Sequence, residues 1–107
     1  MSTFSIEASC DAVALRLACV GELDAAATCL LADAVRAHEA AGSGRVVLDL
    51  ARTTFIDSSG IATIVKLSRS LREHDVHLEL VRAGRTVRRA FELCGLLHLL
   101  ELDPAPS

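Results

Sequence analysis

Apolar residues recur along the chain with two different periods, and the change of period marks the expected elements. Positions 13, 15, 17 and 19 carry apolar side chains larger than alanine, which is typical of a half-buried strand. A shorter strand at 4–8 and a turn at 9–11 precede this segment. The chain should therefore open with a β-hairpin.

Three further segments carry apolar residues at helical spacing. The first follows Asp24, a suitable N-cap, and ends at Gly42. The second covers 61–74, and the third has Thr86 as its N-cap and Gly95 as its end. The buried faces expected of the three helices are Ala27, Leu30, Leu31, Ala34 and Val35; Ile61, Ile64, Val65 and Leu71; and Val87, Ala90, Phe91 and Cys94.

Strands at 46–50 and 76–81 separate these helices, and 96–102 is expected to form a last edge strand. Strands joined through helices imply right-handed parallel crossovers, whereas the hairpin supplies an antiparallel pair. The sequence thus predicts an α/β fold. Its mixed β-sheet has four or five strands and an N-terminal β-hairpin, with three helices packed largely on one face.

Length, hydropathy and net charge limit the domain organisation and the kinds of partner that the sequence allows. At 107 residues a single domain is expected, with a core at about 4–102 and a flexible tail at 103–107. No apolar stretch reaches membrane-spanning length, and the N-terminus lacks a signal-peptide pattern. A net charge of −3 without a basic cluster argues against nucleic-acid binding. We expect a cytoplasmic protein with no membrane contact.

The four cysteines form no C-x-x-C pair and stand at apolar positions, so they are interpreted as buried structural thiols. A zinc site needs clustered ligands, which the sequence does not provide. No metal and no cofactor are therefore expected. The cysteines are Cys10, Cys19, Cys29 and Cys94.

The most informative segment is a buried strand followed by a polar loop and the residues Asp57-Ser58-Ser59-Gly60 at the start of a helix. Asp and Ser are preferred N-caps, so capping alone accounts for one such residue. Three stand here in a row, at a helix N-terminus where backbone N–H groups favour an anion. Gly60 leaves the first turn without a side chain, which would let another molecule approach Ser58. The loop is therefore either a cap or a phosphate-carrying site.

These residues resemble the signature of the STAS domain in bacterial anti-sigma factor antagonists. The resemblance rests on Val47–Leu50 with Phe55–Ile61, supported by Gly21–Asp24 and by Val87–Leu96, and it extends from about residue 4 to residue 102. It implies a partner-switching cycle. The unphosphorylated antagonist binds an anti-sigma factor serine kinase and releases the sigma factor, and phosphorylation abolishes this binding until a metal-dependent serine phosphatase reverses it.

The resemblance also implies the site residues. Ser58 is the phosphoacceptor, and Ser59 shapes the loop. Asp24, Asp57, Ser59 and Gly60 belong to the partner-binding surface. Family members commonly continue into another helix after the last strand, but Pro104 and Pro106 are incompatible with that helix here.

Other functions fit the residues less well. A serine hydrolase needs a G-x-S-x-G elbow and a histidine placed as its base, and the serine loop has neither feature. A nucleotide-binding protein needs a glycine-rich phosphate loop, which the sequence also lacks. The protein is accordingly expected not to be an enzyme. The alternative that stays open is a non-phosphorylated STAS scaffold module of a transporter, a lipid-transport complex or a stress-sensing complex.

Overall fold

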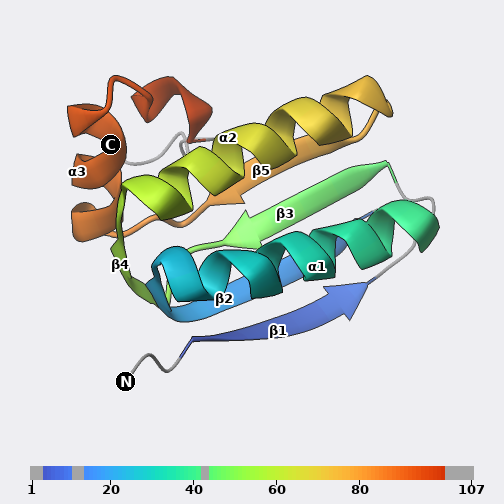
Figure 1. The fold of residues 1–107 in the computed structure, drawn as a ribbon, viewed down its shortest axis with the longest axis horizontal. Coiled ribbons are helices and arrows are strands. Elements are labelled where there is room, and N and C mark those ends of the chain that lie inside the picture. The colour runs from blue at the N-terminus through green and yellow to red at the C-terminus, as the bar shows by residue number, and fades with distance from the viewer. Residues whose placement is uncertain (1–3, 11–13, 42–43, 101–107) are drawn as a thin grey trace.

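The computed structural model describes residues 4–10, 14–41 and 44–100, without the side chains of 38–41. Five strands and three α-helices follow one another in this part of the chain, and a short 3₁₀ helix closes it (Figure 1). The elements are β1 (Ser5–Cys10), β2 (Leu15–Leu23), α1 (Ala25–Ala41), β3 (Arg45–Asp49), β4 (Thr53–Ile56), α2 (Ser58–Glu73), β5 (His77–Val81), α3 (Arg85–Leu93) and η1 (Leu97–Leu99).

The strands form a mixed sheet in the order β1-β2-β3-β5. β1 and β2 make the predicted antiparallel hairpin pair, and the other pairs are parallel. β4 pairs with the last residues of β2, beyond the segment that pairs with β3. The predicted α/β fold with a mixed sheet is confirmed.

Helices α1 and α2 lie side by side over one face of the sheet, as Figure 1 shows. α3 packs against β4, at the side of the molecule toward which β3 points. α1 buries Ala27, Leu31 and Val35, one residue per turn, against the strand side chains of the same face. Leu30, expected in this buried stripe, is 52% exposed because it lies one position outside it.

β4 is a strand that the sequence analysis places in a loop. Thr53 and Ile56 are both buried while the two residues between them are exposed, so the two-residue repeat of a strand is absent. A register shift opposite Gly21 and Glu22 leaves Thr54 as the extra residue of a β-bulge. The bulge therefore conceals the strand from a search for alternating residues.

The expected edge strand at 96–102 is wrong for its described part. Gly95 (φ 72°) ends α3, and residues 97–99 form the 3₁₀ helix η1 instead. The amides of Leu99 and Leu100 then bond to carbonyls three residues earlier, so these groups need no strand partner. Residues 101–107, which include the expected tail and both prolines, lie outside the described residues.

Thr86 is not the N-cap of the third helix. The helix begins at Arg85, and the N-cap is Gly84, which has no side chain to accept a hydrogen bond. The expectation that Gly42 ends the first helix lies outside the described residues.

Candidate functional site

Two strand ends place the predicted site residues on neighbouring parts of the sheet. Leu23 and Ile56 are register partners in the parallel β2–β4 pair. Asp24 and Asp57 follow these partners, and each begins the approach to a helix. The structure therefore brings together two loops that lie more than thirty residues apart in the sequence.

Each aspartate caps the helix that follows it. Asp24 Oδ1 accepts hydrogen bonds from the amides of Ala26 and Ala27, both at 3.1 Å. Asp57 Oδ1 accepts one from the amide of Gly60 at 3.0 Å. The predicted cap at Asp24 is confirmed, and the serine loop has its cap in Asp57.

The two serines of the loop differ in exposure and in hydrogen bonding. Ser59 is half-buried, and its hydroxyl donates a 2.6 Å hydrogen bond to Asp57 Oδ1. Its carbonyl accepts a bond from Thr63 Oγ1 at 3.0 Å. Ser58 is exposed at the first position of α2, and within the described residues its hydroxyl has no hydrogen-bond partner. Of the two hydroxyls, only that of Ser58 is free for chemistry.

The carboxylate of Asp57 is held in its charged form. The hydroxyl of Ser59 and then the amide of Gly60 keep the pKa of Asp57 below its ordinary value. Asp57 is therefore an anionic cap and a poor proton donor. As a negative charge next to Ser58, it also opposes a second negative charge there.

Gly60 packs against its own chain. It is buried, and a Cβ atom there would lie 2.4 Å from the carbonyl oxygen of Leu23 and 2.9 Å from Cγ1 of Ile56. The interpretation that the missing side chain leaves room for another molecule is therefore wrong. The space is filled by β2 and β4, which allows α2 to start close to the sheet.

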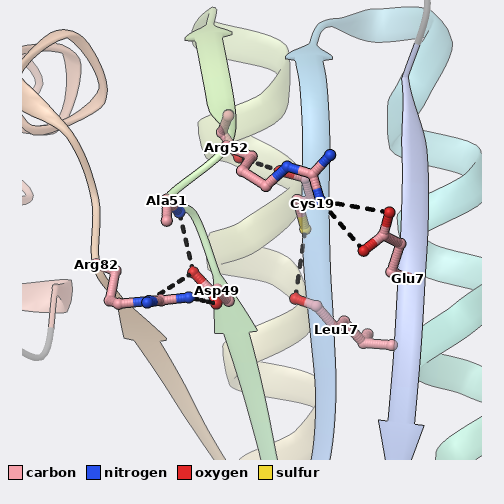
Figure 2. A network of polar contacts seen from close by, with 8 residues as sticks. Glu7, Leu17, Cys19, Asp49, Ala51, Arg52 and Arg82 are labelled. Carbon is pink, nitrogen blue, oxygen red and sulfur yellow. Dashed lines mark hydrogen bonds and ion pairs between the residues drawn. The ribbon is translucent and has the colours of Figure 1, made fainter.

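A polar network fixes the turn that leads into β4 (Figure 2). Asp49, at the end of β3, accepts bonds from the amide of Ala51 and from the guanidinium of Arg82. The Arg82 bond contributes most to keeping the pKa of Asp49 below its usual value. Arg52 reaches across the sheet to Glu7 of β1 at 3.3 Å. These contacts hold the turn between β3 and β4, and hence the approach to Ser58.

The cysteines do not share one environment, so the expectation of four buried thiols is wrong. Cys19 is buried, and burial raises the pKa of its thiol to about 12, with the charge of Asp49 adding to the effect. Its Sγ lies 3.9 Å from the carbonyl of Leu17. The exposed thiols are those of Cys10, Cys29 and Cys94, and the last of these was expected on the buried face of the third helix.

Two large apolar residues, one on β4 and one on α3, are exposed, which the sequence analysis did not foresee. Phe55, two residues before Asp57, is 44% exposed, and Leu93 at the end of α3 is 74% exposed. A signal was available for Phe55, since it is one of only three phenylalanines in the chain and follows two threonines. An exposed aromatic ring three residues before the exposed Ser58 is consistent with a protein-binding surface.

The described residues provide neither a metal-binding group nor a membrane-spanning helix. Within 4–10, 14–41 and 44–100, histidine, cysteine and acidic side chains form no group of three that could hold a metal ion. Among the helices described, none has the length and apolar character needed to span a membrane.

Comparison with known proteins gives the family. Residues 5–106 match the model of the STAS domain. BtrV of Bordetella bronchiseptica, named as an anti-sigma factor antagonist, is 36% identical over 58 residues. This match covers 54% of the present chain and 50% of BtrV, so the chain aligns with about half the length of this curated relative.

Solved structures agree on the fold. An anti-sigma factor antagonist from Mycobacterium paratuberculosis has a TM-score of 0.82 at 22% identity, covering 97% of this chain and 88% of its own. The antagonist SpoIIAA in its unphosphorylated form has a TM-score of 0.77 at 24% identity, covering 94% and 88%. SpoIIAA has also been solved in its phosphorylated form, with a TM-score of 0.70 at 20% identity, covering 94% and 91%.

Proposed function

The chain belongs to the STAS domain family, and from this premise we propose that it acts as an anti-sigma factor antagonist in a bacterial partner-switching pathway. In its unphosphorylated form it binds an anti-sigma factor serine kinase and so releases the sigma factor. The kinase phosphorylates Ser58 and thereby ends the complex, and a serine phosphatase restores the binding form. The protein works in the cytoplasm as a substrate and binding partner, without catalytic activity of its own.

The single observation that carries this proposal is the contrast between the two serines. Ser59 donates its hydroxyl hydrogen to Asp57 at 2.6 Å, whereas Ser58 is exposed and its hydroxyl makes no hydrogen bond to any described residue. A kinase needs a hydroxyl that can enter its active site without breaking the loop. Ser58 meets this need, and Ser59 could do so only by giving up its bond to the cap.

Phosphorylation is proposed to block the contact surface while leaving the fold in place. A phosphate on Ser58 adds about −1.5 to −2 charges at the first position of α2, where the helix dipole favours an anion. Repulsion from Asp57 offsets part of this gain. In the complex the same phosphate is desolvated against the partner, and a loss of about 3–5 kcal/mol there weakens binding by about 10²- to 10⁴-fold.

The contact surface proposed here is built from the two loops at the strand ends. Asp24, Asp57 and Ser59 lie around Ser58, and Gly60 contributes by seating α2 against β2. Phe55 adds an exposed aromatic ring on the strand that leads into the loop. Aromatic residues, phenylalanine among them, are enriched in protein interfaces relative to the rest of the surface.

The test uses three variants with the cognate kinase and ATP, read by intact mass and by binding. Ser58→Ala should take up no phosphate and should keep binding, Ser58→Asp should bind poorly, and Ser59→Ala should still take up one phosphate. Full phosphorylation of Ser58→Ala would identify a different acceptor. If the wild type neither binds the kinase nor takes up phosphate, the alternative role as a non-phosphorylated scaffold module is favoured.

A further inference from the structure

The outward side of α3 is basic. Val87 and Phe91 are fully buried against the rest of the molecule, so the opposite side of the helix faces solvent. That side carries Arg85, Arg88 and Arg89, which together with Glu92 line a shallow hollow of about 370 Å³. The three arginines fall within five residues of the sequence, and the expectation of no basic cluster is therefore wrong for this segment. The helix brings Arg85 beside Arg88 and Arg89, which stand three and four residues further along.

These arginines form no ion pair within the described part of the chain. The ion pairs there join Arg36 to Asp33, Arg45 to Glu79, Arg52 to Glu7 and Arg82 to Asp49, and none includes a residue of α3. The protein as a whole carries a formal charge of −3. The basic face of α3, defined as Arg85, Arg88 and Arg89, is thus a local reversal of the overall charge.

This arrangement opposes the stability of α3. The N-terminal end of a helix favours acidic residues, and each well-placed charge there contributes about 0.3–1 kcal/mol. α3 has no acidic residue in its first turn, begins with Arg85 and has a glycine N-cap without a side-chain hydrogen bond. Local rules that are broken without an internal gain are expected at functional sites.

The position of α3 connects its basic face to the serine loop. α3 packs on β4, and β4 leads directly into Asp57 and Ser58. Two of the three large apolar residues exposed in the described chain, Phe55 and Leu93, lie on these same two elements. Exposed aromatic, aliphatic and arginine side chains in one region have the composition of a protein interface.

We propose that the basic face of α3 docks against an acidic surface of the anti-sigma factor kinase and steers Ser58 toward the kinase's ATP. This inference rests on the proposed function. Unpaired cations accelerate association with an acidic partner by 10- to 10³-fold at low salt. Phosphorylation of Ser58 places a dianion near the basic face of α3 and offsets the same attraction. The phosphorylation that ends the complex therefore also slows re-association with the kinase.

The experiment compares two double charge reversals by stopped-flow or surface-binding kinetics with the purified kinase. Arg88→Glu/Arg89→Glu changes the basic face, and Lys66→Glu/Arg69→Glu on α2 is the matched control. Both variants lower the net charge by four. The control sites lie about 12 Å or more from Ser58 along the helix axis, beyond the screening length of about 8 Å at physiological salt.

The α3 variant should associate at least about 10-fold more slowly than wild type at low salt and lose most of its salt dependence, whereas the control should change far less. The variant leaves the buried anchors Val87 and Phe91 in place, so α3 should stay folded, which circular dichroism verifies. Equal slowing in both variants, or no slowing in the α3 variant, overturns the inference although wild type binds and is phosphorylated. Failure of wild type to bind the kinase would overturn the proposed function as well.

Discussion

Replacing Gly60 by alanine tests whether this glycine is needed for packing inside the protein. The new Cβ would lie 2.4 Å from the carbonyl oxygen of Leu23, which is backbone, and 2.9 Å from a side-chain carbon of Ile56. The Leu23 carbonyl cannot easily retreat, because it belongs to the β2–β4 pair and faces the amide of Asp57 at 3.5 Å. Either α2 must move away from the sheet or the strand pair must distort.

The magnitude follows from two opposing effects. Overpacking costs about 1–3 kcal/mol, and a contact of this closeness against backbone belongs at the upper end. Alanine recovers about 0.5–1 kcal/mol because it is a better helix residue than glycine. The net loss should be about 2 kcal/mol in the free energy of unfolding, which for a chain of this size lowers the Tm by about 8 °C or more.

Urea and thermal unfolding followed by circular dichroism measure this loss. Gly44→Ala is the matched control, since nothing lies within 4 Å of a Cβ built there, and it should be neutral or stabilising by up to about 1 kcal/mol. Unchanged stability of Gly60→Ala would refute the packing argument. If kinase binding were lost at the same time, Gly60 would be a direct contact with the partner.

Two further predictions concern side chains whose protonation the fold controls. Ser59→Ala removes the first contributor to the low pKa of Asp57, so NMR titration should find that pKa raised toward 3.8. The stability that the Asp57 carboxylate supplies is present above the unfolded pKa and is lost as pH falls through the folded one. In the variant this contribution should therefore be smaller, and its loss should be complete at a higher pH; an unchanged titration would contradict the assigned hydrogen bond. For the thiols, a maleimide reagent at pH 7 should label the native protein three times and the unfolded protein four times by intact mass, because only Cys19 is buried; labelling of Cys19 in the native state would disprove its enclosure. The three reactive residues should be Cys10, Cys29 and Cys94.

Much of the fold could be predicted from the sequence, because in most elements a single signal, either a hydrophobic period or a capping residue, determines the local structure. β2, α1 and α2 follow simple periods, and Asp24 caps its helix as an aspartate before an apolar stripe should. Where two rules compete, the prediction was wrong. The leucine-rich segment after Gly95 fits a strand by composition, but hydrogen bonds within the segment satisfy its backbone first.

The candidate site was predictable in its residues and not in their roles. Both serines and Asp57 are polar residues before a helix, and local sequence cannot assign the cap to one of them. The assignment depends on where the chain leaves β4, which places Asp57 in the extended conformation and Ser59 within reach of its carboxylate. The role of Gly60 likewise depends on Leu23, a residue distant in sequence that a strand pairing brings near.

The bulge at Thr54 has a consequence for how this protein can vary. Thr53 and Ile56 stand three residues apart and both face the core, because the bulge adds one exposed residue to the two-residue repeat of the strand. Thr54 has no register partner in β2, whereas Phe55 pairs with Glu22 and Ile56 pairs with Leu23. Removal of Thr54 would therefore restore regular alternation and leave Ile56 in register and facing the core. At this position β4 can gain or lose one residue while the orientation of the loop that follows is preserved.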